Sequence, residues 1–131
     1  MRLELEWPEE LDALLAAPRN HTLLFENEFV RVLDTRVPPG ETVPAHTHRW
    51  PGALYFLSWS DCVRRDAEGA VVMDTRNMRK ALEEDIALVN TAMWSGPLAL
   101  HTLENVGDRE LSVICVEVKY TVLAPGSKTE S

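Results

Sequence analysis

The segment from Val37 to Leu57 constrains the fold most, because it combines turn residues with two closely spaced histidines. Two prolines and Gly40 open the segment, and proline cannot extend a central strand. His46 and His48 are one residue apart, so in an extended strand both side chains lie on one face. A Pro-Gly pair then precedes an apolar run. The pattern predicts two strands joined by turns, with a pair of imidazoles that can bind zinc, copper, iron or nickel.

The length and charge of the chain limit its architecture and its partners. A chain of 131 residues can bury one core but not two. It has 21 acidic and 13 basic residues and a net charge of −8, which argues against nucleic acid or an anionic membrane surface as a partner. No apolar run approaches the ~20 residues of a membrane span. The N-terminus lacks the apolar core of a signal peptide, and two cysteines make no disulfide framework, so we expect a cytoplasmic protein.

Short apolar runs between turn residues predict an all-β protein with one short N-terminal helix. Residues 1–20 are the predicted helical extension, residues 21–123 a single barrel domain, and residues 124–131 a flexible tail. The helix over Pro8–Ala17 is expected to pack a leucine stripe on the outside of the sheet. Met78–Asp85 fits either a helix or a loop, and Ile86–Asn90 a short strand. The other predicted strands include Thr22–Glu26, Phe29–Val37, Ala53–Trp59, Asp61–Arg65, Ala70–Asp74, Ala92–Trp94, Leu98–Leu103 and Glu110–Val122.

Two histidine-bearing stretches resemble the motifs of the cupins. The first cupin motif has Gly, five residues, His-x-His, three or four residues, Glu, six residues and Gly. Gly40, His46 and His48 match it, whereas Gly52 stands at the Glu position and Trp59 at the closing Gly. The second motif ends in His, three residues and Asn, which His101 and Asn105 match. Its earlier Gly, Pro and Gly positions fall on Asn90, Gly96 and Leu98.

The resemblance covers roughly residues 23 to 122 and implies a cupin-type double-stranded β-helix, or jelly-roll barrel. It implies that His46, His48 and His101 bind a divalent metal, with iron as the first candidate and zinc, nickel or manganese as alternatives. Three hydrogen-bonded histidines without metal are the other interpretation. His21 is expected to be a loop residue at the helix exit. Without the Glu, a bound dication favours an anionic fourth ligand, and Asp34 is a candidate if its strand face points inward.

Further side chains are candidates for a pocket around the centre. Strand alternation continued from His48 puts two apolar residues inside the barrel, two tryptophans neighbour the motifs, and guanidinium groups bind carboxylates. For the tryptophans and arginines, ordinary rim, core or surface positions are the alternative. The candidate pocket residues are Leu54, Phe56, Trp50, Trp94 and Asp34, and the candidate carboxylate clamps are Arg36 and Arg49. Asn105 is expected to pin the turn after its strand, and Cys115 to be a buried small hydrophobe.

Three functions remain open from the sequence. The first is a metal-dependent enzyme, dioxygenase- or isomerase-like, that acts on a small organic acid or amino-acid-derived metabolite. The chain is also similar to small bacterial cupins associated with β-alanine catabolism, which likewise depart from the Glu position. The second is a non-catalytic cupin that binds or senses a small molecule. The third is a structural module. The resemblance and the long apolar strand at Glu110–Val122 suggest a homodimer through sheet edges.

Overall fold

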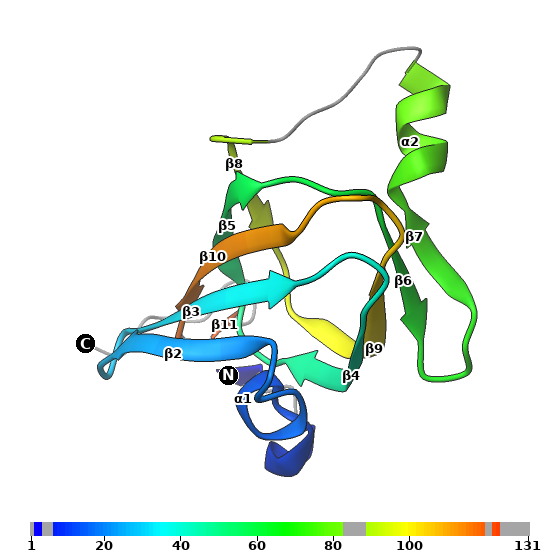
Figure 1. The fold of residues 1–131 in the computed structure, drawn as a ribbon. Coiled ribbons are helices and arrows are strands. Elements are labelled where there is room, and N and C mark those ends of the chain that lie inside the picture. Colours follow the sequence, from blue (N-terminus) through cyan, green and yellow to red (C-terminus); the bar gives the residue numbers. More distant parts are fainter. Residues whose placement is uncertain (1, 4–6, 83–88, 120–121, 124–131) are drawn as a thin grey trace.

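The computed structural model describes residues 2–3, 7–82, 89–119 and 122–123, and most of them form two antiparallel sheets that face each other (Figure 1). The first sheet has the order β2 (His21–Glu26), β3 (Val30–Val37), β10 (Leu111–Val118), β5 (Gly52–Ser58) and β8 (Ala92–Ser95). The second has the order β4 (Thr42–His48), β9 (Leu98–Asn105), β6 (Cys62–Asp66) and β7 (Val71–Asp74). A separate pair joins β1 (Arg2–Leu3) to β11 (Val122–Leu123). The predicted all-β jelly-roll architecture is confirmed.

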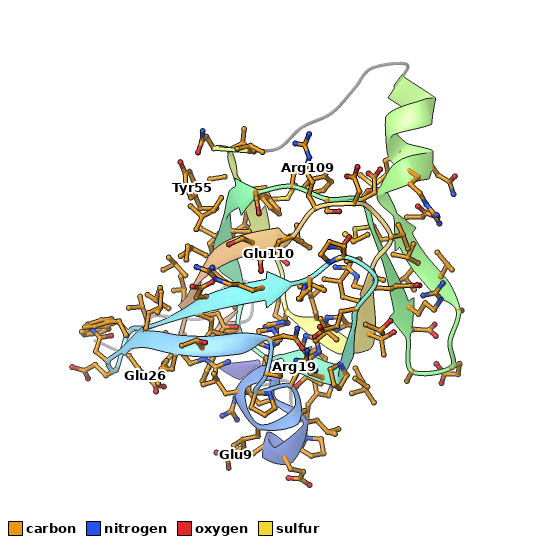
Figure 2. The ribbon with its side chains drawn as sticks, in the orientation of Figure 1. Glu9, Arg19, Glu26, Tyr55, Arg109 and Glu110 are labelled. Carbon is orange, nitrogen blue, oxygen red and sulfur yellow. The ribbon has the colours of Figure 1, made fainter. Side chains whose placement is uncertain are left out.

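The core lies between the two sheets, because alternate residues of each strand point inward. On β3 the inward set includes Arg31, Leu33 and Val37, and on β10 it includes Cys115 and Glu117. Most of this face is apolar, but two charged side chains lie at one end of it. Many other charged residues project outward, as Figure 2 shows for Glu9 and Glu26.

The N-terminal segment packs differently from the prediction. It forms a 3₁₀ turn (Glu9–Leu11) and a short helix α1 (Ala13–Ala16), separated at Asp12, whose side chain accepts a hydrogen bond from the backbone of Leu14. Ala13 and Ala17 are the fully buried apolar residues of this segment, Leu14 packs half-buried against the core cluster of Ala13, Leu33 and Cys115, and Leu15 is 62% exposed. Small side chains let the helix backbone come close to the strands, so the expected leucine stripe is only partly present, and Leu14 packs against the core rather than on the outer sheet face.

Helix α1 contacts both β2 and β4, which are edge strands of the two different sheets (Figure 1). A backbone bridge between Asp12 and Thr47 fixes the helix against β4. The segment therefore spans the gap between two sheet edges at the end of the barrel where the histidines lie.

The remaining elements lie close to the predicted ranges. Residues 75–82 form a helix, α2 (Thr75–Leu82), where the sequence left helix and loop open. The turn at Gly69 has a positive φ of 85°, as expected for glycine in a hairpin turn. Part of the strand predicted at Ile86–Asn90 and the whole tail at 124–131 lie outside the described residues. Within the described part of the chain, no helix is both long and apolar enough to cross a bilayer.

Candidate metal centre

All four histidines of the chain come together in one cluster, which strands of both sheets supply. The ring centroid of His46 lies 4.8 Å from His21, 4.9 Å from His48 and 4.4 Å from His101. His48 lies 5.5 Å from His21 and 5.7 Å from His101. The third motif histidine therefore does lie beside the His-x-His pair, and a fourth histidine joins them.

Strand geometry accounts for the three motif histidines. His46 and His101 are direct cross-strand partners in the β4–β9 ladder, so their side chains lie next to each other on one face. His46 and His48 share that face because they are two residues apart on β4.

His21 belongs to the cluster although the sequence interpretation placed it in a loop. It is the first residue of β2, pairs with Thr35 of β3, and is buried. Because α1 holds β2 close to β4, the ring of His21 reaches the other histidines from the opposite sheet. The loop expectation for His21 was wrong.

Three of the rings are oriented by backbone carbonyls. The Nδ1–H groups donate to the carbonyls two or four residues earlier in the chain: His21 to Ala17 (3.0 Å), His46 to Pro44 (2.7 Å) and His101 to Ala99 (2.7 Å). A carbonyl oxygen can only accept, so Nδ1 carries the proton in each ring. The lone pair on Nε2 is thereby left free, which is the form of imidazole that binds metals.

Burial also keeps these imidazoles neutral. Removal from water lowers the pKa of His21 to about 4 and that of His101 to about 4. The pKa of His46 falls to about 2, first because of burial and then because His48 and His101 lie beside it. At neutral pH these three rings carry no charge, so they can donate lone pairs without first losing a proton.

The donor atoms fit a small cation. One nitrogen each of His21, His46 and His48 lies within 4.8 Å of the others. Nitrogens bound to one tetrahedral ion at about 2.1 Å are roughly 3.4 Å apart. Small side-chain movements would bring the three donors to that spacing, and His101 lies against the same ring of His46.

The fourth ring, His48, is held by a carboxylate instead of a carbonyl. Its Nδ1–H donates to Oε2 of Glu117 over 3.0 Å. Oε1 of Glu117 accepts from Nε of Arg31 at 2.6 Å, and the Arg31 guanidinium also makes two hydrogen bonds of 2.9 Å to Asp12. Glu117, Arg31 and Asp12 are all buried. Sequence reasoning missed this network, for which the hint was an acid near the end of the apolar strand β10.

The predicted pocket residues divide into two groups. Phe56 is buried in the core between the sheets, and Leu54 packs against it while half-buried. The ring of Trp50 lies under three cations, with Arg49 Cζ at 4.7 Å, Arg31 Cζ at 4.9 Å and Lys119 Nζ at 5.3 Å.

Three of the candidates point away from the histidines. Asp34 and Arg36 lie on the outer face of β3, where they pair with each other, because the inward face is the one that carries Arg31 and Leu33. Trp94 is on the edge strand β8 and is 59% exposed. The prediction that these three residues line the pocket or bind substrate was therefore wrong, and they lie on the outside of the barrel. Arg49 remains beside Trp50, and its buried Nε has no hydrogen-bond partner in the part of the chain that the structure describes.

Asn105 and the cysteines have structural roles. The amide of Asn105 donates to the carbonyls of Val37 and Arg109, and its oxygen accepts from Ser60 and Gly107, so it pins the turn as predicted. Cys115 is buried, and burial raises its thiol pKa to about 12. Neither residue takes part in the centre.

Comparison with solved structures identifies the class of fold. Matches include a cupin domain from Bordetella pertussis, 18% identical with a TM-score of 0.56 over 76% of this chain and 92% of that chain. An RmlC-like cupin with a double-stranded β-helix fold from Methanocaldococcus jannaschii is 12% identical, with a TM-score of 0.52 over 75% of this chain and 77% of that one. A double-stranded β-helix protein from Klebsiella pneumoniae is 14% identical, with a TM-score of 0.51 over 75% of this chain and 74% of that one.

The chain therefore has the cupin fold, the double-stranded β-helix that its two histidine motifs predicted. No protein-family model matches the sequence, and no curated protein does either.

Proposed function

We propose that the protein is a metal-binding cupin whose centre is built from His46, His48 and His101, with His21 as a fourth donor. The observation that carries this proposal is the orientation of the rings: each Nδ1–H is used by a carbonyl or by Glu117, so each Nε2 is free. Hydrogen-bonded histidines without a metal would not need the same ring nitrogen to be left free four times.

We further propose that the centre is catalytic and acts on a small organic acid or amino-acid-derived metabolite. Iron is our first candidate, and zinc, nickel and manganese are alternatives, since imidazole suits several first-row ions. Such an ion supplies Lewis acidity and open positions for dioxygen or substrate. Arg49 is the candidate carboxylate clamp, because its buried Nε has no hydrogen-bond partner among the described residues and guanidinium binds carboxylates in a bidentate way.

A non-catalytic binding protein is the second candidate, and one observation favours it. Four imidazoles are enough to saturate a tetrahedral ion, and closed four-ligand sites are typical of structural zinc. The number of imidazoles bound to the ion therefore separates the two functions. Three imidazoles, or four on an octahedral ion, leave coordination positions open for substrate, whereas four on a tetrahedral ion leave none.

The test is metal analysis of protein purified without a histidine tag, followed by titration with Co²⁺, Fe²⁺ and Zn²⁺. We expect one ion per chain, at least tenfold weaker binding in His46→Ala and in His101→Ala, and unchanged binding in Asp34→Asn. The Asp34 variant is the matched control because that carboxylate lies on the outer face of β3.

Binding of no ion by the folded wild-type protein would refute the metal centre. If one ion binds, oxygen consumption with thiols and amino-acid-derived acids tests the catalytic proposal. Absence of turnover together with four bound imidazoles on zinc would favour the binding function.

A further inference from the structure

We propose that Glu117 is a positioning residue of the histidine centre, which fixes the ring of His48 and supplies, from the neighbouring strand, the negative charge that the cupin motif has at position 52. The inference rests on the proposed metal centre. It concerns a residue that lies outside both histidine motifs.

The first step is that the carboxylate comes from β10 and not from the motif position on β5. Gly52 on β5 and Glu117 on β10 are direct cross-strand partners. A Cβ atom at Gly52 would lie 2.6 Å from the carbonyl oxygen of Val116 and 3.1 Å from Cα of Glu117, distances that the backbone cannot accommodate without moving. The side chain of a Glu at position 52 is thus excluded in this backbone, and the carboxylate beside it comes from β10.

The second step is the fixed orientation of that carboxylate. Glu117 is fully buried, and its two oxygens have different partners: Oε1 accepts from Arg31, and Oε2 accepts from Nδ1 of His48. Rotation of the carboxylate would break both bonds in a site that excludes water, so each oxygen stays with its partner. The ring of His48 is therefore held with Nε2 directed away from Glu117, toward the other histidines.

The third step is the charge of the assembly. Glu117 is the acid of the Asp12–Arg31–Glu117 network that touches His48, so its carboxylate brings the negative charge to the centre, whereas His21, His46 and His101 donate their Nδ1–H to uncharged carbonyls. A carboxylate that accepts from the distal N–H of a ligating histidine makes the imidazole a stronger donor and fixes its orientation. The negative charge thus acts on a bound dication through His48, without direct coordination.

The competing explanation is that Glu117 only neutralises the buried Arg31. Asp12 offers a matched control, because it pairs with the same guanidinium but does not touch His48. The affinity of the centre for a metal therefore separates the two explanations. It should fall when a residue that positions His48 is replaced, and stay unchanged when a residue that only stabilises the network is replaced.

The experiment is a Co²⁺ titration, followed by the visible absorption of the ion, of wild type, Glu117→Gln and Asp12→Asn. We expect the Glu117 variant to bind Co²⁺ about 10- to 100-fold more weakly than wild type and with an altered spectrum. The Asp12 variant should lose stability but stay within about threefold of the wild-type Kd.

Equal loss of affinity in both variants, or wild-type affinity in Glu117→Gln, would overturn the positioning role while leaving the metal centre intact. If the wild type binds no Co²⁺, the proposed function fails, and this inference with it. Should Glu117→Gln not fold, ¹⁵N spectroscopy of the metal-free wild type decides: a proton on Nδ1 of His48 supports the role, and a bare Nδ1 contradicts it.

Discussion

His21 approaches the other histidines from the opposite sheet because the carbonyl of Ala17, at the end of α1, holds its Nδ1. A fourth imidazole adds a donor but no charge. A dication in this centre would be balanced by Glu117 only through His48, and an anionic substrate or hydroxide would still be attracted to it. At the scale of single residues, a dication held by these histidines would thus favour small anions as its further ligands.

Replacing His21 by Ala tests whether it is a ligand. We expect metal affinity to fall at least tenfold, about 1.4 kcal/mol, and X-ray absorption of the bound ion to show one imidazole fewer than wild type. Thr22→Ala, at the next and exposed position of β2, is the control and should bind as wild type. Unchanged affinity and imidazole count would make His21 a hydrogen-bonded neighbour of the centre.

Some of these residues were predictable and others were not. Alternation along β4 predicted that His46 and His48 share a face, because that signal is local, and the resemblance to the cupin motifs added His101. The position of His21 depends on how α1 packs between two sheets, which no nearby residue indicates. The inward face of β3 was ambiguous because both faces carry apolar residues. Arg31 is tolerated inside only because Asp12 and Glu117, far away in sequence, pair with it.

At the scale of elements, the backbone of β10 leaves no room for a Cβ atom at Gly52 of β5, where Gly52 faces Glu117. The strand boundaries were well predicted from turn residues and alternation, since both depend on neighbouring residues. The clash that a side chain at position 52 would make with the β10 backbone was not predicted, and it shows that this backbone does not accept a Glu there. Gly52 is required by packing at this point.

Placing the Glu of the cupin motif at position 52 should therefore harm the protein. We expect Gly52→Ala to lower the free energy of unfolding by about 2 kcal/mol through overpacking against the β10 backbone, and Gly52→Glu to do so at least as much. Neither should bind metal more tightly than wild type. Urea unfolding and Co²⁺ titration measure the two effects.

Gly96→Ala is the control, since a Cβ there meets no atom within 4 Å and the residue has no positive φ. It should change stability by no more than about 0.5 kcal/mol. Tighter metal binding by Gly52→Glu would show that the two strands can separate to admit a carboxylate ligand.

At the scale of the whole molecule, the Asp12–Arg31–Glu117 network joins the N-terminal segment, β3 and β10 at the end of the barrel next to the histidines. The two-sheet fold was predictable because alternation and turns specify it locally. The position of α1 between the sheets was not predictable, because it depends on buried salt bridges between residues that are distant in sequence. The homodimer and the small-molecule ligand stay predictions.

The network makes the stability of the fold depend on pH. Burial alone would raise the pKa of Asp12, but the hydrogen bonds and charge of Arg31, with a smaller effect of Arg49, outweigh it and lower that pKa. The carboxylate therefore stabilises the fold above its unfolded pKa near 3.8, and this contribution is lost as pH falls through the lower folded value.

Asp12→Asn should accordingly cost about 3 kcal/mol of unfolding free energy at pH 7. The difference from wild type should shrink as both proteins are acidified below pH ~4. Urea unfolding between pH 7 and the onset of acid denaturation measures it. A difference that stays constant with pH would mean that the negative charge of Asp12 does not stabilise the fold.

The concentration of all four histidines in one place has a practical consequence. A reagent that acylates imidazole, such as diethyl pyrocarbonate, has no other histidine to modify on this chain. It would enter beside His48, whose side chain is 16% exposed. The extent of histidine labelling then measures metal occupancy without an engineered probe, since a bound ion would shield the Nε2 atoms that coordinate it.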